Sequence, residues 1–244
     1  MVSFTAMGRA GNFFFECATA WAYAKRHGLR FSVPKHTSHQ YWSPIYLHHL
    51  IDPDYNPVNQ ITVEEKQFHY APIPFEESWR GRNILLHGYF QSPKYFDEYR
   101  DEMLNAFNLS WEYREGFVSV HIRRGDYLKL TMKHPPVSKE WYENAMSMFP
   151  GKKFIFFSDD IEYCKQTFGK RRDCLFSEGK TVEQDLIDMS CCEHNIISAS
   201  TFGWWGAYLN KNKDKTVVLP KLWFQPGWDN ADTSDIVPSE WIKI

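Results

Sequence analysis

Apolar and polar positions follow strand-like and helix-like periods over most of the chain, and this pattern predicts an α/β protein. From about residue 112 onward, five short apolar runs are typical of buried strands: 117–122, 153–157, 174–176, 195–199 and 216–219. Four helical segments separate them: one that Ser138 caps and that ends at Pro150, then 161–168, 181–192 and 202–210. Strands and helices in this alternation form a parallel, doubly wound sheet with right-handed crossovers.

The N-terminal part opens with a similar but shorter pattern. A strand at 2–5 precedes the turn 8–12, and an apolar helix over 13–25 ends near Gly28, where a C-cap glycine belongs. Strand, glycine turn and helix are the start of a nucleotide-binding βαβ unit, whose helix N-terminus favours an anion. A tight turn without any ligand fits the same residues about equally well.

Residues 34–82 interrupt this regularity. Prolines and scattered aromatic residues break both periods, so only a short helix near 45–50 is predicted there. Order returns with a buried strand at 83–86 and a helix over 94–107, which the preceding Ser-Pro pair begins.

Four histidines in or near the irregular stretch are a candidate metal cluster: His36, His39, His48 and His49. Neither cysteines nor carboxylates stand beside them at the spacing of a ligand set, so we do not expect a metal there.

The onset of regular alternation predicts a domain boundary. We expect a first α/β domain over 1–111, a nucleotide-binding domain over 112–220, and a tail, 221–244, that packs back on the body. A chain of 244 residues is long enough for two such cores.

Composition narrows the class of protein. A net charge of −2 argues against a general nucleic-acid binder, which would carry a basic stripe. No stretch approaches the ~20 consecutive apolar residues of a membrane span, and the N-terminus lacks the pattern of a signal peptide. Five cysteines, two of them adjacent, do not form a disulfide framework. We therefore expect a cytoplasmic protein, with peripheral contact to the inner membrane face left open.

Polar side chains follow three of the predicted strands at the points where those strands end. They are Arg123-Arg124-Gly-Asp126, Ser158-Asp159-Asp160 and Ser200-Thr201. The carboxyl ends of parallel strands meet at one edge of a sheet, where ligands bind in open α/β folds. Arginine suits a phosphate because its planar fork can hold two oxygens at once. A surface turn whose arginines pair with neighbouring carboxylates is the alternative interpretation.

The remaining acidic and hydroxyl residues at this edge have two interpretations each. Ser200 and Thr201 are placed as helix caps, but they also suit a phosphate. Asp159 and Asp160 fit a cap with sugar or nucleoside contact better than a divalent metal, because Arg123 and a helix N-terminus can neutralise a diphosphate.

Three motifs carry a resemblance to a known family. His121-Ile-Arg-Arg-Gly-Asp126, Ser200-Thr-Phe-Gly-Trp-Trp-Gly-Ala-Tyr-Leu209 and Gly8-Arg-Ala-Gly-Asn12 resemble the α-1,2-fucosyltransferases of glycosyltransferase family eleven. The match covers nearly the whole chain, although the usual opening of the family has glycine and leucine where Arg9 and Ala10 stand here.

The resemblance implies a GT-B-like fold of two Rossmann-like halves, with the acceptor on the side of 1–111 and the donor site in the doubly wound domain. It implies transfer of L-fucose from GDP-fucose to the 2-hydroxyl of a terminal galactoside, with inversion and without a metal or other cofactor. By the resemblance, Arg123 holds the diphosphate, and Asp126 is either the base or a partner that locks Arg123. The substrate-binding residues that follow are Gly11, Asn12, His121, Arg124, Asp159, Asp185, Ser200, Thr201 and Phe202.

Asp185 stands in the first turn of a helix, where a carboxylate is favourable in any protein. If that helix end faces the ligand, the carboxylate can accept two N–H bonds from a guanine edge. Two other classes of function stay open: a transferase for a different nucleotide sugar or acceptor, and a fold-mate that binds a glycan or nucleotide without turnover.

Overall fold

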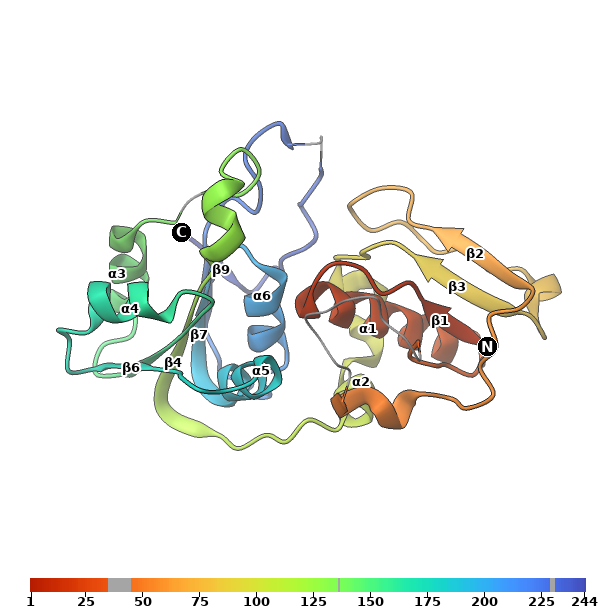
Figure 1. Cartoon of the computed structure of the whole chain (residues 1–244), viewed down its shortest axis with the longest axis horizontal. Coiled ribbons are helices and arrows are strands. Elements are labelled where there is room, and N and C mark those ends of the chain that lie inside the picture. The colour runs from red at the N-terminus through yellow and green to blue at the C-terminus, as the bar shows by residue number, and fades with distance from the viewer. Residues whose placement is uncertain (35–44, 136, 229–230) are drawn as a thin grey trace. The chain divides into compact units, whose positions relative to one another are not determined.

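The computed structural model describes residues 1–34, 45–135, 137–228 and 231–244, which form two compact units (Figure 1). Unit 1 comprises Met1–Leu109 and Ala231–Pro238, and unit 2 comprises Ser110–Asn230 and Ser239–Ile244. The C-terminal segment therefore contributes to both units. Within the described residues, no helix has the length and apolar character needed to cross a membrane.

Unit 1 contains a three-stranded parallel sheet in the order β1-β3-β2 (Figure 1). Its strands are β1 (Val2–Phe4), β2 (Gln60–Glu64) and β3 (Asn83–His87). The prediction of irregular structure over 34–82 is wrong for β2. That strand lies at the sheet edge and fully buries only Val63, so it shows little of the apolar alternation that identifies a strand.

Helix α1 (Ala10–Arg26) packs on β1 and starts three residues earlier than predicted. Gly11 and Asn12 consequently lie in its first turn rather than in the turn before it. The helix is buried over most of its length, because small residues and three consecutive phenylalanines cover nearly its whole circumference. The predicted short helix is confirmed as η1 (Ile45–Leu50). Another one-turn helix, η2 (Glu77–Trp79), precedes β3.

The predicted helix over 94–107 is divided into three pieces. They are η3 (Pro93–Tyr95), η4 (Asp97–Tyr99) and α2 (Arg100–Phe107). The Ser92 side chain accepts from the Lys94 amide, as the predicted cap requires. Phe96 then leaves the helical region with φ −140° while its side chain is fully buried, so the burial of this ring interrupts the helix.

Unit 2 contains six parallel strands in the order β6-β5-β4-β7-β8-β9. Their bounds are β4 (Arg114–Ile122), β5 (Lys153–Ser158), β6 (Cys174–Phe176), β7 (Cys192–Ile197), β8 (Val217–Leu219) and β9 (Ile242–Lys243). The sequence predicted five of these. It missed β9, because two exposed residues are too few to form a pattern.

Helices cover both faces of this sheet, with α3 and α4 on one side and α5 and α6 on the other (Figure 1). Their bounds are α3 (Lys139–Ser147), α4 (Ile161–Phe168), α5 (Val182–Cys191) and α6 (Thr201–Tyr208), and the short η5 (Gly125–Lys129) follows β4. Thr181 and Gln184 form a capping box at the start of α5, where the sequence predicted a helix to begin. The apolar side chains of the central strands, among them Val118, Val120 and Phe156, form the core. The doubly wound fold predicted from the sequence is thus the observed one.

Candidate functional site

The three predicted clusters of polar residues lie at one edge of the unit 2 sheet. Strand β4 is hydrogen-bonded to β5 on one side and to β7 on the other, and all three run parallel. The residues that follow their carboxyl ends are therefore neighbours, as the sequence predicted.

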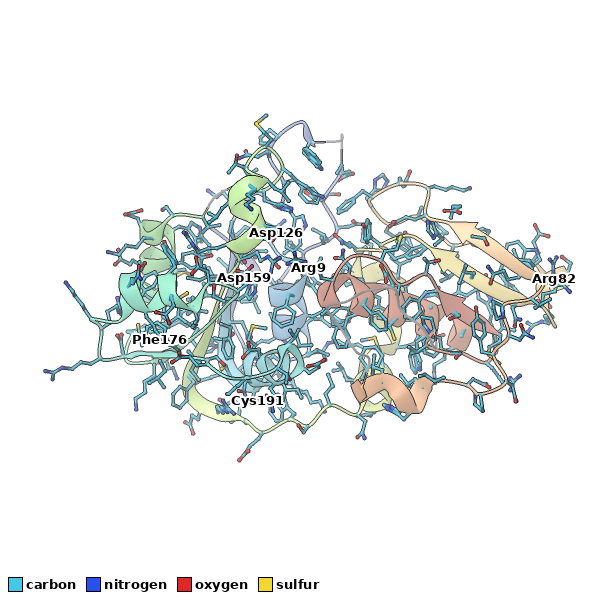
Figure 2. The ribbon with its side chains drawn as sticks, in the orientation of Figure 1. Arg9, Arg82, Asp126, Asp159, Phe176 and Cys191 are labelled. Atoms are coloured by element: carbon cyan, nitrogen blue, oxygen red, sulfur yellow. The ribbon has the colours of Figure 1, made fainter. Side chains whose placement is uncertain are left out.

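Arg123 is held between two carboxylates at this edge. One terminal nitrogen donates to Asp126 Oδ1 at 2.5 Å, and the other lies 2.8 Å from Asp159 Oδ2. Figure 2 shows Asp126 and Asp159 close together on unit 2. The Arg123 side chain is only 15% exposed, so the two carboxylates fix the direction of its guanidinium. This pre-orientation is what tight recognition of a phosphate requires.

Arg124 is directed away from Arg123 by a different set of contacts. Its Nε donates to Asp160 Oδ2 at 3.1 Å, and its guanidinium lies 3.4 Å from the centre of the Tyr163 ring on α4. Asp160 also caps α4 by accepting from the Tyr163 amide. The predicted cap at Asp160 is confirmed, and Arg124 is engaged by α4 rather than grouped with Arg123.

His121 is the second-last residue of β4 and lies two positions before Arg123. Its ring is 4% exposed, and Nδ1 is 2.9 Å from Ser198 Oγ. Burial, reinforced by the nearby Arg123 charge, lowers the pKa of His121 to about 3, so the ring is neutral at physiological pH. A Cβ on Gly203 would lie 2.6 Å from this Nδ1, and the glycine is therefore what allows α6 to approach His121.

The N-terminus of α6 brings Ser200, Thr201 and Phe202 to the same edge. The Phe202 ring lies 5.7 Å from the His121 ring. Ser200 occupies the N-cap position, but within the part of the chain that the structure describes its hydroxyl makes no capping hydrogen bond. The prediction that the side chain caps the helix is wrong. A first helical turn has amides without intrahelical partners, and such a turn suits an anion.

Asp185 and the two N-terminal candidates make contacts with other residues. Asp185 accepts from Ser177 Oγ at 2.6 Å just beyond β6, and burial raises the pKa of its carboxyl. Gly11 and Asn12 belong to unit 1, where Asn12 Oδ1 accepts from the Gln91 side chain at 3.0 Å. Within unit 2 the structure groups Arg123, Asp126 and Asp159 closely, and Asp185 lies beside the carboxyl end of β6, two strands from β4.

Two residues that the sequence analysis did not single out support the site. Tyr127 lies under the Arg123 guanidinium, 5.4 Å from it, and its hydroxyl donates to the Ala199 carbonyl at 3.3 Å. Burial raises the pKa of Tyr127 to about 12, so it stays a donor. Ser198 orients His121. Ser198 directly follows β7, so the sequence could have indicated it as a site residue. The role of Tyr127 could not be predicted in this way, because it depends on a contact with Ala199, which is distant in the sequence.

No group of three or more histidine, cysteine or acidic side chains that could hold a metal occurs among the described residues. Two of the four candidate histidines, His36 and His39, lie outside the described residues, as does the side chain of His48. His49 Nε2 lies 2.7 Å from the Ala106 carbonyl.

Comparison with known proteins relates this chain to sugar transferases. The family model described as "Glycosyl transferase family 11" matches residues 4–244. An α-1,2-colitosyltransferase of Escherichia coli is 33% identical over 180 residues, covering 64% of this chain and 61% of the relative. A galactoside α-(1,2)-fucosyltransferase 2 of Oryctolagus cuniculus is 25% identical over 245 residues, covering 86% of this chain and 67% of the relative. The chain thus spans about three fifths of the length of the colitosyltransferase.

Among solved structures, POFUT1 in complex with GDP-fucose superposes with a TM-score of 0.51 at 12% identity, covering 88% of this chain and 97% of that one. At this identity the likeness concerns the fold, which is of the GT-B type, as the sequence predicted. The match of the family model over nearly the whole chain decides the family. This chain belongs to glycosyl transferase family 11.

Proposed function

We propose that this chain transfers L-fucose from GDP-fucose to the 2-hydroxyl of a terminal galactoside, with inversion at the sugar carbon and without a metal ion. The observation that carries the proposal is the Arg123 guanidinium, which two carboxylates hold at the end of β4 beside the N-terminus of α6. Family membership, the fucosyltransferase named among its relatives and the GDP-fucose complex of a fold-mate support this choice of donor.

Stabilisation of the leaving group is the step that this geometry explains best. The acceptor oxygen forms a bond to C1 of the sugar and gives up its proton to water, while the bond from C1 to the diphosphate breaks and its electron pair leaves with GDP. The diphosphate gains negative charge as that bond breaks. A guanidinium and helix amides that are already oriented stabilise this charge without reorganising, which is commonly the largest contribution to catalysis.

In this mechanism Asp126 locks Arg123 and is not the base. Its Oδ1 is already engaged by the guanidinium at 2.5 Å, so this oxygen is not available to take the proton of the acceptor hydroxyl. Asp159 serves Arg123 in the same way and also accepts from the Arg124 amide at 2.9 Å.

A second candidate donor follows from the colitosyltransferase among the relatives. That enzyme is named for a different sugar and the same α-1,2 linkage, so a colitose-bearing nucleotide sugar is the alternative substrate. The diphosphate contacts described above do not distinguish between the two sugars.

The test is incubation of the purified chain with GDP-fucose, GDP-colitose or UDP-galactose and a panel of β-galactosides, followed by NMR of the product linkage. We expect an α-1,2-linked fucoside and release of GDP. Transfer of colitose alone would select the second candidate. GDP binding without any turnover would identify a non-catalytic binding protein and refute the proposal.

Chelation separates the metal-free mechanism from a metal-assisted one. Three carboxylates (Asp126, Asp159 and Asp160) form ion pairs with Arg123 and Arg124, so the formal charge of this group is not positive. A metal ion bound by these carboxylates is therefore the alternative to be tested. The carboxylates are nevertheless turned towards the guanidiniums rather than towards one another. We expect EDTA to leave the initial rate within about twofold of the untreated enzyme, because charge stabilisation comes from Arg123 and α6. A complete loss that Mn²⁺ or Mg²⁺ restores would make Asp159 and Asp160 metal ligands.

A further inference from the structure

The turn that follows β3 in unit 1 has an unusual backbone. Gly88 has φ 154°, and Phe90, a non-glycine residue, has φ 49° with its ring only 1% exposed. A bulky side chain in this region is unfavourable, and such a conformation persists only where neighbouring groups impose it. Something must therefore hold this turn.

Glu65, the residue directly after β2, holds it. One carboxylate oxygen accepts from the Tyr89 amide at 2.7 Å and the other from the Phe90 amide at 2.9 Å. The Glu65 amide in turn donates to the His87 carbonyl at 2.8 Å. A Cβ on Gly88 would lie 2.2 Å from the Glu65 Cβ, so only glycine admits this carboxylate. The turn and Glu65 are built as one unit.

The turn places Gln91 in contact with the first turn of α1. Gln91 is 6% exposed, and its amide nitrogen donates to Asn12 Oδ1 at 3.0 Å. Asn12 lies in the first turn of α1 and is one of the residues for which the family resemblance implies a substrate contact. A continuous set of contacts thus runs from Glu65 through the turn and Gln91 to Asn12.

The Glu65 contact depends on ionisation. Burial raises the pKa of Glu65 to about 7. The titratable groups that interact with it are Glu16 of α1, whose pKa burial raises to about 9, and Tyr95 of η3, whose pKa burial raises to about 12. Tyr95 in turn interacts with Asp235, which lies 3.5 Å from Lys94 Nζ. A carboxylate can accept at both oxygens, whereas the acid form uses one oxygen as a donor, so protonation removes one of the two amide contacts.

We propose that Glu65 is a positioning residue, which fixes Asn12 against substrate through the turn 88–91. This inference rests on the proposed function, because it takes Asn12 to contact a substrate of the transfer. The consequence is an acid limb in the pH profile: below about pH 7 Glu65 takes up a proton, the turn loosens, and Asn12 loses its fixed orientation.

Glu65→Gln tests the kinetic consequence. Glutamine keeps one acceptor and places an N–H group against an amide N–H, so we expect KM for one of the two substrates to rise on the order of tenfold, and kcat to change less than threefold. The fall of kcat/KM below about pH 7 should be absent in the variant. Glu64→Gln is the matched control, because the Glu64 side chain is 66% exposed and its carboxylate lies 3.8 Å from Nε2 of His87 at the end of β3. This variant should keep the parent profile.

NMR provides a reading that does not need turnover. The Tyr89 and Phe90 amide signals should titrate with an apparent pKa about 7 in the parent, and this step should vanish in Glu65→Gln. The Asn12 side-chain amide should shift in Glu65→Gln and not in Glu64→Gln. An unmoved Asn12 signal, or unaltered KM with the acid limb retained, overturns the proposal. An inactive parent enzyme refutes the proposed function alone, and the Asn12 signal still decides this inference.

Discussion

Arg123→Lys is expected to lower kcat by a factor on the order of 10² or more, the effect of removing one preorganised donor. Lysine keeps the charge but cannot make the two-pronged contact with phosphate oxygens, and it cannot bridge Asp126 and Asp159 as the guanidinium does. The diphosphate gains charge in the transition state, so kcat should fall much more than the KM for GDP-fucose rises. Steady-state kinetics on the purified variant measure both.

Arg171→Lys is the matched control for this substitution. Arg171 makes a two-pronged ion pair with Asp173 at 3.0 and 2.7 Å near the start of β6, away from the carboxyl edge of the sheet. An exposed pair of this kind contributes ~0–1 kcal/mol to stability, so this variant should keep the parent kcat. If Arg123→Lys also retained kcat within threefold, Arg123 would be a structural arginine paired with its aspartates, and the proposed mechanism would be wrong.

Gly203→Ala is expected to destabilise unit 2 and to weaken the binding of GDP together. The new Cβ would lie 2.6 Å from His121 Nδ1 and 3.2 Å from Ile197 Cβ, and both neighbours are buried. Overpacking of this kind costs ~1–3 kcal/mol. Since His121 must move to admit the methyl group, its hydrogen bond with Ser198 is lost and the end of β4 shifts. Thermal unfolding and calorimetry with GDP measure the two effects.

Gly206→Ala in the same helix separates stability from binding. Its Cβ would meet Met189, at 2.8 Å from the methyl carbon, on the side of α6 that packs against α5. This control should also lower the unfolding temperature, but it should leave the affinity for GDP unchanged at a temperature where both variants are folded. Equal affinities in the two variants would show that His121 does not serve the nucleotide.

The sequence determined those features that depend on neighbours along the chain. The apolar runs of 117–122 and 153–157 are strands because both faces of a central strand are buried, and such strands carry a continuous apolar signal. The capping residues Ser138 and Thr181 act on amides three residues away, so their helices begin where the sequence predicted. The polar clusters at the strand ends could be predicted because each directly follows its strand along the chain.

An edge strand and the interruption of a helix could not be predicted from the pattern of neighbouring residues. Strand β2 is half-exposed and lies among prolines, and only its pairing with β3 defines it. Phe96 interrupts a helix that local preferences favour, because the ring is drawn into the core of unit 1. In both cases tertiary packing outweighs preferences that amount to a few tenths of a kcal/mol per residue.

The tertiary structure alone decided which charges meet at the edge of the unit 2 sheet. Asp159 reaches Arg123 because β5 is the neighbour of β4 in the sheet, which the order of strands along the chain does not state. The pKa values of His121 and Glu65 are likewise properties of burial, and burial is a result of the whole fold. Local sequence thus determined the residues available at the ends of the strands, and long-range packing decided their partners and their charge.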